Sequence, residues 1–173
     1  MEKNRQGLLH IYCGDGKGKT SAAVGMAVRA AGCGMKVLVI RFLKTENSGE
    51  VEVLRSIPGI TVPPCERTFG FVFRMTEEQK QEAALYYQSR FEAAAKKAVQ
   101  GQYDLLILDE ILASCNYGMV RETSVVEFLQ NRPEKLEVVL TGRNPSETFL
   151  ELADYVSEIC MRRHPYEKGI PAR

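Results

Sequence analysis

The chain has 173 residues, a length that accommodates one domain with a buried hydrophobic core. Hydrophobic residues make up 45% of it and charged residues 26%, as in an ordinary globular protein, and the formal net charge is +1. A nearly neutral chain is not expected to carry a broad basic surface for nucleic acid or for a membrane. We therefore expect a single domain over residues 1–173.

The start of the chain and its cysteines indicate the compartment. The opening residues Met-Glu-Lys-Asn-Arg-Gln precede no apolar segment of a signal peptide, and no apolar run is long enough to span a bilayer. The five cysteines are an odd number without a CxxC pair, which disfavours a disulfide framework or a zinc site and fits a reducing environment. We expect a soluble, cytoplasmic protein whose partners include neither a membrane nor nucleic acid.

Apolar runs of strand length alternate with helical patterns, which predicts an α/β fold: a mostly parallel central sheet with helices on both faces. The expected strands are residues 8–13, 36–42, 60–62, 105–108, 137–141 and 155–161. The expected helices are residues 20–31, residues 77–100, a segment that includes 125–129 and a segment that begins at Ser146. The polar stretches 44–50 and 66–74 are expected to be loops at the edge where the first strand ends, which is where such sheets bind ligands.

The helix with the clearest signals is residues 77–100. Thr76 can cap its first turn, and Gln79 stands three residues later, the spacing of a capping box. Gly101 can end the helix. An apolar stripe at helical spacing is formed by Ala83, Tyr87, Phe91, Ala94 and Ala98. The pattern predicts an amphipathic helix with one buried face.

A glycine-rich segment joins the first strand to the following helix. Its residues are Gly14, Asp15, Gly16, Lys17, Gly18, Lys19, Thr20 and Ser21. The glycines let the backbone wrap closely around an anion, and the helix N-terminus adds positive potential. Lys19 would contact phosphate oxygens and Thr20 would offer its hydroxyl to Mg²⁺, so the segment is predicted to be a P-loop that binds the triphosphate of ATP.

This segment departs from the strict P-loop pattern at its first position. Cys13 stands where G-x-x-x-x-G-K-[ST] has its first glycine, so the loop counted from Gly14 is one residue short. The alternative interpretation is a flexible turn of glycine and lysine. The strand before it, the helix after it and Gly-Lys-Thr at the junction favour phosphate binding.

Two acidic residues, Asp109 and Glu110, follow the apolar strand 105–108. An apolar strand that ends in acids often accompanies a P-loop, because Mg²⁺ needs hard oxygen ligands beside the phosphates. These two carboxylates and Thr20 are therefore the candidate metal ligands. The alternative for Asp109 is the N-cap of a helix in the segment that follows.

Several stretches resemble, in the same order, the ATP:corrinoid adenosyltransferases, which are the cob(I)alamin adenosyltransferases of the P-loop type. One is the glycine-rich loop without the usual first glycine, and the others are residues 39–44, 70–73, 106–111, 139–143 and 164–170. The resemblance extends over residues 7–173. It implies a P-loop NTPase-like fold and transfer of the 5′-deoxyadenosyl group of ATP to cobalt(I) of a corrinoid, with triphosphate as the leaving group.

The resemblance also implies roles for the residues around the loop. Lys19, Thr20 and the loop amides would hold the leaving triphosphate, with ATP bound in the reverse direction to that in other P-loop proteins. Mg²⁺, held by Thr20 and by Glu110 or Asp109, would neutralise the charge that develops there. Cobalt(I) is the nucleophile, so no protein base is required. A flavin-type electron donor and a homodimer are further implications.

An aromatic segment has two interpretations. Phe69, Phe71 and Phe73 alternate, which fits either one face of a core strand or an exposed loop with aromatic side chains. The last of these positions is often tryptophan in the family, so an aromatic ring is retained here. The resemblance implies that Phe71 and Phe73 act on the corrinoid, where they displace the lower axial ligand and make cobalt easier to reduce.

Basic residues at strand ends are further candidate ligands. Arg41 and Lys44 could meet phosphate or the corrin amides, with a solvated strand end as the alternative, and Arg143 could face phosphate. His164 and Tyr166 are candidate substrate contacts, whereas the arginine pair 162–163 is interpreted as a solvated strand end. The short arm 1–6 before the first strand implies that a lid formed by a longer arm in relatives is missing.

Two other functions are open from the sequence. A P-loop kinase or NTPase would cleave the β–γ bond of ATP, and a nucleotide-binding regulator would bind without turnover. The regulator leaves the motif at residues 70–73 unexplained.

Overall fold

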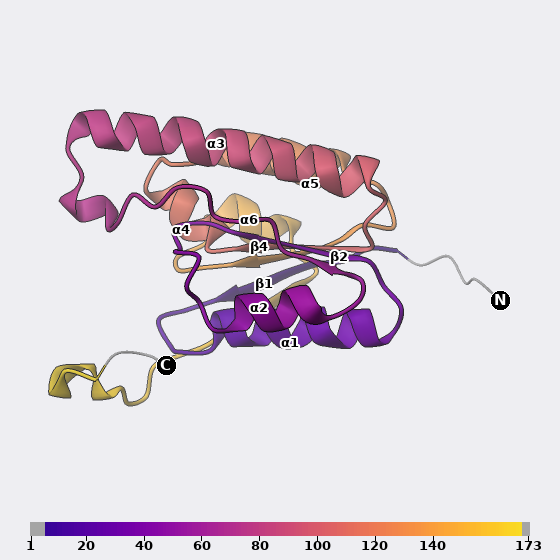
Figure 1. Cartoon of the computed structure of the whole chain (residues 1–173), viewed down its shortest axis with the longest axis horizontal. Coiled ribbons are helices and arrows are strands. Elements are labelled where there is room, and N and C mark those ends of the chain that lie inside the picture. The colour runs from indigo at the N-terminus through magenta and orange to yellow at the C-terminus, as the bar shows by residue number, and fades with distance from the viewer. Residues whose placement is uncertain (1–5, 171–173) are drawn as a thin grey trace.

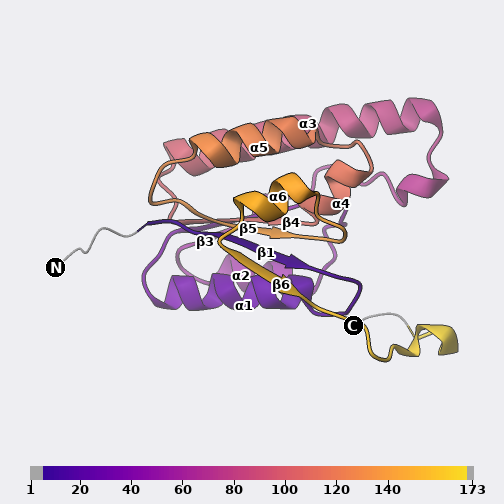
Figure 2. The same cartoon turned by 180° about the vertical axis from the view of Figure 1, so that it is seen from behind.

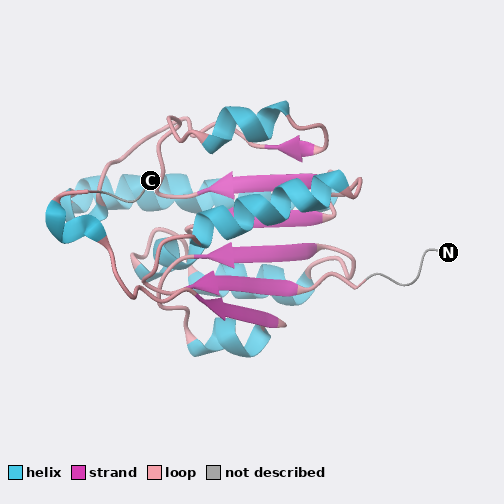
Figure 3. Ribbon diagram, turned by 90° about the horizontal axis from the view of Figure 1, so that it is seen from below, coloured by secondary structure: helices cyan, strands magenta, loops and turns pink. Residues whose placement is uncertain are grey.

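The computed structural model describes residues 6–170, without the side chains of Tyr166 and Glu167, and has a six-stranded parallel sheet at its centre. The strands are β1 (Leu9–Cys13), β2 (Val37–Arg41), β3 (Ile60–Thr61), β4 (Leu105–Asp109), β5 (Glu137–Thr141) and β6 (Tyr155–Glu158). Their order is β3-β2-β4-β5-β1-β6, and all neighbouring pairs are parallel. All the arrows in Figure 3 point the same way, so the carboxyl ends of the strands share one edge. The predicted sheet is therefore confirmed.

Helices cover both faces of this sheet, as predicted. They are α1 (Lys19–Gly32), α2 (Glu50–Ser56), α3 (Glu77–Gln100), α4 (Ile111–Asn116), α5 (Glu122–Asn131) and α6 (Glu147–Leu152), with 3₁₀ turns at Val72–Arg74 and Pro165–Lys168. Figures 1 and 2 show α1 and α2 on one face and α3, α5 and α6 on the other. Helices α2 and α4 are not predicted from the sequence, because seven and six residues are too few to display a helical period. None of the described helices is long and apolar enough to cross a membrane.

Each face of the sheet has its own hydrophobic cluster. All five residues of β2 and of β4 are buried, because successive side chains of a strand point to opposite faces and both faces are covered. In β2, Leu38 and Ile40 join the cluster that includes α3, while Val37 and Val39 join the cluster that includes α1 and α2. This two-sided burial is the reason that the central strands appear in the sequence as unbroken apolar runs.

The capping box predicted for α3 is present. Thr76 Oγ1 accepts a hydrogen bond from Gln79 N at 3.2 Å, and Gln79 Oε1 accepts one from Thr76 N at 2.9 Å. All five residues of the predicted apolar stripe are buried. Gly101 is the C-cap of the helix, as the sequence predicts.

The last strand is shorter than predicted. β6 ends at Glu158, and residues 159–161 leave the sheet although the sequence places them in the strand. Ile159 N still donates a hydrogen bond to Cys13 O at 2.8 Å, but Ile159 O accepts one from Gly16 N at 2.7 Å. At Ile159 the hydrogen-bond partner of the chain thus changes from strand β1 to the glycine-rich loop. The alternation of side chains in the sequence cannot show where this change occurs.

Replacing Phe91 by alanine should lower the free energy of unfolding by about 3–5 kcal/mol, because it opens a cavity in the core beneath α3. Phe91 is 2% exposed, and its ring packs edge-on against Phe128 at 6.0 Å. Leu85→Ala on the same helix is the matched control, since Leu85 is 75% exposed. Its effect should stay within about 0.5 kcal/mol. Urea unfolding followed by circular dichroism measures both variants, and equal losses would contradict this orientation of α3.

Candidate active site

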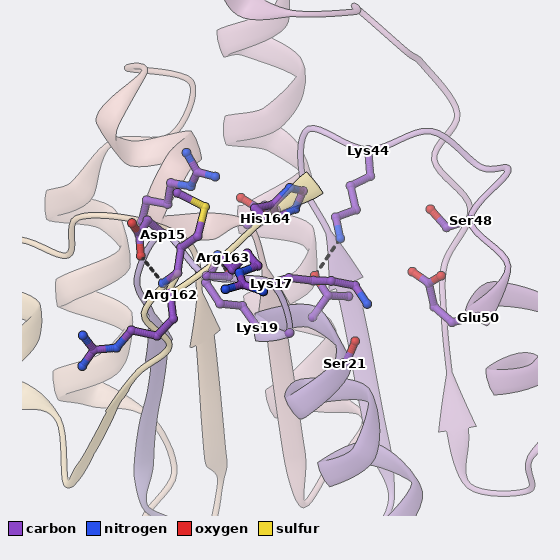
Figure 4. Close-up of a pocket in the computed structure, with 16 residues that line it drawn as sticks. Asp15, Lys17, Lys19, Ser21, Lys44, Ser48, Glu50, Arg162, Arg163 and His164 are labelled. Carbon is purple, nitrogen blue, oxygen red and sulfur yellow. Dashed lines mark hydrogen bonds between the residues drawn. The ribbon is translucent and has the colours of Figure 1, made fainter. Parts of the chain in front are cut away.

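A cavity of about 1190 Å³ opens at the carboxyl edge of the sheet. It exceeds the roughly 300–1,000 Å³ of ordinary small-molecule pockets, so it has room for a nucleotide with its triphosphate. Its walls come from the loop 15–21, from residues between 44 and 50, from Glu110 and Arg143 beyond β4 and β5, and from the segment 161–164. Figure 4 shows side chains of the loop and of the C-terminal segment lying close together in this space.

Positive charge predominates among the side chains that line the cavity. The lysine and arginine residues there are Lys17, Lys19, Lys44, Arg143, Arg162 and Arg163. The carboxylates there are Asp15, Glu50 and Glu110, of which Asp15 already accepts a hydrogen bond from Met161 N at 2.8 Å. Such a surplus of cations favours a ligand with several negative charges.

The glycines of the loop allow it to lie directly on the segment that follows β6. A Cβ atom at Gly14 would lie 2.4 Å from Ile159 O, and one at Gly16 would lie 2.6 Å from the same atom. Gly14 also has a φ of 105°, in the region that favours glycine. Gly14 does not itself line the cavity, whereas the predicted residues 15–21 all do. These contacts fix the shape of the loop before any ligand binds.

Lys19 lies under the loop at the N-terminus of α1. Its side chain is 9% exposed, and Nζ donates a hydrogen bond to Gly16 O at 2.8 Å. Burial lowers the pKa of Lys19, and the nearby carboxylate of Glu110 opposes this shift. An anion in the cavity would favour the charged form and raise the pKa again. The geometry suits a preorganised cation for phosphate oxygens.

Asp109, at the end of β4, is the centre of a polar cluster. Its side chain is buried, and its carboxylate accepts hydrogen bonds from Thr20 Oγ1 at 3.0 Å and from Thr141 Oγ1 at 2.7 Å. Lys44 Nζ lies 2.7 Å from Asp109 Oδ2 and 2.8 Å from Thr20 Oγ1. The N-cap alternative for Asp109 is wrong, because Glu110 is the N-cap of α4 and no side chain caps that helix.

Glu110 faces the cavity beside this cluster. Its φ of 63° lies in the left-handed region, which is rare outside glycine and turns the chain sharply after the strand. Its backbone N donates a hydrogen bond to Thr141 Oγ1 at 2.9 Å. Burial raises the pKa of the Glu110 carboxyl, and the negative charge of Asp109 raises it further. Of the two predicted carboxylates, Asp109 is the buried one and Glu110 lines the space.

Arg41 does not line the cavity, so the expected direct contact with a ligand is not part of this geometry. Its side chain is 2% exposed, which also excludes the solvated strand end. The guanidinium donates to Thr45 O and to Ser48 Oγ, the latter at 3.1 Å. Arg41 thereby holds the loop that brings Lys44 and Ser48 to the cavity wall.

The turn after β2 is strained. Leu43 has a φ of 53°, and the left-handed region costs a residue other than glycine about 1–2 kcal/mol. Phe42, the residue before it, is fully buried in the core. The fixed ends of the turn place the next residue, Lys44, beside Asp109. Figure 4 shows Lys44 and its hydrogen bond to Thr20.

The aromatic segment divides into a buried and an exposed part. Phe69 packs against Tyr86 and Tyr87, at 5.5 and 5.8 Å between ring centroids. Phe71 and Phe73 are 65% and 76% exposed and stack on each other at 5.3 Å. The core-strand interpretation is therefore wrong for these two residues.

Phe71 and Phe73 lie outside the lining of the cavity. Their segment nevertheless extends past the same end of the sheet as the yellow C-terminal segment in Figure 1. The views from both sides agree on this placement (Figures 1 and 2).

The C-terminal segment contributes residues that the sequence analysis interpreted differently. Arg162 and Arg163 are exposed, as predicted, but they line the cavity together with Met161 and the predicted contact His164. Figure 4 shows His164 and Arg163 close to the lysines of the loop. The position of two arginines directly after the predicted strand 155–161, at the carboxyl edge of a parallel sheet, was the available signal. The side chain of Tyr166 and the arm 1–5 lie outside the described residues.

The comparison with solved structures concerns the fold. The chain is similar to ATPases 2 and 3 of EssC from Geobacillus thermodenitrificans, with a TM-score of 0.53 and 10% identity over 96% of this chain and 34% of that chain. A second structure, the cytoplasmic domain of EssC, gives a TM-score of 0.53 and 11% identity, again with 34% of that chain covered. The chain thus spans about a third of these ATPase chains, and the likeness supports a P-loop NTPase-like fold.

The comparison with protein families concerns nearly the whole sequence. Residues 5–173 match the family described as ATP:corrinoid adenosyltransferase BtuR/CobO/CobP. Corrinoid adenosyltransferases from Pseudomonas aeruginosa and Escherichia coli K12 are 31% and 32% identical over 172 residues, which are 99% of this chain and 83% and 85% of those proteins. The corresponding protein of Salmonella typhimurium is 30% identical over 99% of this chain and 85% of its own length. The chain therefore belongs to the ATP:corrinoid adenosyltransferase family.

Proposed function

We propose that this protein, as one domain, transfers the 5′-deoxyadenosyl group of ATP to cobalt(I) of a corrinoid and releases triphosphate. The observation that carries the proposal is the cationic cavity around the loop 15–21, in a chain whose relatives are named corrinoid adenosyltransferases. The electron pair of cobalt(I) forms the bond to the 5′ carbon, the bond between that carbon and the ester oxygen breaks, and the triphosphate leaves with the electrons. A flavin-type electron donor and a homodimer belong to the proposal as expectations from the resemblance.

The residues of the cavity act on the leaving group. Lys19 and the side chains of Arg143, Arg162 and Arg163 surround a space for an anion whose charge increases as the carbon–oxygen bond breaks. Positive groups that are already in place stabilise that charge without reorganisation during the reaction. Because the corrinoid supplies the nucleophile, the cavity needs no side chain that abstracts a proton.

Thr20 and Asp109 fit a magnesium ion. Mg²⁺ binds oxygen at about 2.0–2.1 Å in an octahedron, so two adjacent ligands lie about 3 Å apart. Thr20 Oγ1 and Asp109 Oδ1 are 3.0 Å apart, and a cation, the ammonium of Lys44, already bridges the two side chains. Glu110, which lines the cavity beside Asp109, is the further candidate ligand from the protein, and phosphate oxygens or water would complete the octahedron. Bound there, Mg²⁺ would add positive charge beside the triphosphate.

The exposed pair Phe71 and Phe73 is our candidate surface for the corrin ring. Two adjacent phenylalanines with more than half of their surface in water are unusual unless a partner covers them. Arg74 lies over both rings, at 5.7 and 5.6 Å from their centroids, and thereby helps to hold them together. A flat, partly apolar corrin ring could lie on this pair. The two phenylalanines would then shield the lower face of the corrin ring from water.

The rival function, a kinase or NTPase that cleaves the β–γ bond, is not favoured by the family. The fold likeness to the EssC ATPase domains is at 10–11% identity and says nothing about which bond breaks.

Replacing Lys19 by methionine, which keeps the buried stem, should reduce the transfer rate about a hundredfold or more, because the loss of one preorganised charge costs on the order of 3 kcal/mol. Lys17→Met is the matched control. Lys17 lines the same cavity but is exposed, so solvent screens its charge. Its replacement should therefore lower the transfer rate by less than about tenfold. Steady-state transfer rates at saturating ATP measure both. Equal losses would remove the special role of Lys19.

Replacing Phe71 or Phe73 by alanine should slow transfer about tenfold, equivalent to about 1.4 kcal/mol of barrier, when cobalt must be reduced on the enzyme. The loss should be much smaller when cobalt(I) is supplied by chemical reduction, because the lower ligand is then already absent. Val53→Ala, at another exposed apolar position, should leave both rates unchanged. Equal losses of the phenylalanine variants in both assays would contradict the proposed contact.

The products distinguish the proposal from its rival. With ATP, Mg²⁺ and cobalt(I) corrinoid, the wild-type protein should release inorganic triphosphate in amounts equal to the adenosylated corrinoid. Without corrinoid, ATP should be consumed very slowly. Ion-exchange chromatography of the nucleotides and phosphates measures both. Formation of ADP at ordinary enzymatic rates without corrinoid would reject adenosyl transfer and favour the kinase or NTPase.

A further inference from the structure

The ammonium group of Lys44 lies between the two side chains that are our candidates to bind the metal. Its Nζ is 2.8 Å from Thr20 Oγ1 and 2.7 Å from Asp109 Oδ2. Both distances are those of short, charge-assisted contacts. The Lys44 side chain is 22% exposed and the Asp109 side chain 3%, so this contact is largely shielded from solvent.

The fold fixes Lys44 in this position from both sides. Arg41 and Asp109 are register partners in neighbouring strands, and Phe42 N donates a hydrogen bond to Asp109 O at 3.0 Å. Leu43 then takes a φ of 53°, and the guanidinium of Arg41 holds the chain again at Ser48. The short strained turn between these anchors returns Lys44 to the end of β4.

A magnesium ion and the ammonium of Lys44 cannot use these oxygens together. The ion would lie about 2.0–2.1 Å from Thr20 Oγ1 and from an Asp109 oxygen, in the space that the ammonium now occupies. A magnesium ion and an ammonium group in contact with the same two oxygens would also repel each other strongly. Binding of the metal therefore requires Lys44 to move away.

We propose that Lys44 is an internal cation that fills the metal position while the site is empty, and that Mg²⁺ displaces it toward the triphosphate. The inference rests on the proposed assignment of Thr20 and Asp109 as metal ligands. Lys44 lines the cavity, so its ammonium can rotate toward phosphate oxygens without a change in the backbone. In the absence of nucleotide, displacement would break the contact of the ammonium with Asp109 without offering phosphate oxygens in its place, which disfavours metal binding.

It follows that metal and nucleotide bind cooperatively. The triphosphate accepts the displaced ammonium and offers oxygens to the metal, so each ligand lowers the cost of binding the other. Asp109 has a charged partner in both states, Lys44 before loading and the metal after it. The buried carboxylate is therefore never left without a counter-charge, a situation that would be strongly destabilising.

The test compares Lys44→Met with Lys17→Met and wild type, with Mn²⁺ as the probe for the Mg²⁺ position. Both variants remove one positive charge from the same cavity, but Lys17 makes none of the described contacts with Thr20 or Asp109. Mn²⁺ binding without nucleotide or corrinoid is followed by electron paramagnetic resonance of the free ion. Lys44→Met should bind Mn²⁺ about tenfold or more tighter than wild type, within the usual range of coupling between sites. Lys17→Met should differ from wild type by less than about threefold, because its charge is screened.

Two further measurements on Lys44→Met should change in directions that a merely structural role of Lys44 would not produce. Lys44→Met should bind ATP in the presence of Mg²⁺ more weakly than wild type, although it binds the metal alone more tightly. With a chelator present, its melting temperature should fall below that of wild type, and excess Mn²⁺ should restore it, which also shows that the variant folds.

Metal affinity of Lys44→Met equal to that of wild type, or raised no more than in Lys17→Met, would overturn the inference. Mn²⁺ binding by none of the three proteins, even with ATP, would reject the metal site and this inference with it. Because no arm contains corrinoid or measures transfer, either result is distinguishable from failure of the proposed adenosyl transfer.

Discussion

The buried carboxylate of Asp109 joins segments that are far apart in the sequence. It accepts hydrogen bonds from Thr20 at the start of α1 and from Thr141 at the end of β5, and it pairs with Lys44 beyond β2. A charge buried this deeply is tolerated only when partners surround it. The requirement fixes the relative position of three strand ends, and residues just beyond them, Lys44, Glu110 and Arg143, line the cavity.

The order of the strands decides which partners Asp109 can reach. β5 lies between β4 and β1, so Thr141 stands between the carboxylate and the strand that leads into the glycine-rich loop. The same hydroxyl accepts a hydrogen bond from Glu110 N and thereby supports the left-handed turn that directs Glu110 into the cavity. A single threonine thus contacts both acidic residues, the buried Asp109 and Glu110, which lines the cavity.

The glycine-rich loop depends on a second constraint, its contact with the segment after β6. Gly14 and Gly16 approach the backbone of Ile159 so closely that no other residue would fit, and Met161 N is bound to Asp15. The glycine-rich loop and the segment that carries Arg162 and Arg163 are therefore held against each other by backbone contacts. Cys13, where the common pattern has a glycine, is buried as the last residue of β1. At this position the chain is still strand, which is why a glycine is not required there.

The two parts of the site have opposite chemical character, and their separation suits two unlike substrates. The cavity is lined mainly by cations and suits a polar anion, while Phe71 and Phe73 expose an apolar surface outside it. The loop 44–48 borders the first part, and Glu46 in this loop accepts a hydrogen bond from Cys65 N, in the segment that leads to the aromatic pair. Burial of Phe69 against Tyr86 and Tyr87 anchors that segment to α3, so the exposed rings project from a fixed base.

Local signals in the sequence determined the class of fold and the centre of the site. Apolar runs marked the strands because both faces of the sheet are covered, the capping box marked α3, and the glycines before Lys19 and Thr20 marked the loop. These features depend on neighbours within a few residues, so they can be read along the chain. The family, and with it the aromatic pair, came from the ordered resemblance of whole stretches.

Only the tertiary structure decided the direction of the long side chains and the partners of the short segments. Arg41 and Lys44 both stand near the end of β2, yet Arg41 turns into the protein to hold a loop and Lys44 turns back onto Asp109. That difference depends on the pairing of β2 with β4 and on the positive φ of Leu43, neither of which has a local signature. Arg162 and Arg163 reach the cavity because β6 lies beside β1 and the chain leaves the sheet at Ile159. A contact between residues 146 positions apart in the sequence, such as the hydrogen bond from Met161 N to Asp15, is decided by packing of the whole sheet rather than by the residues themselves.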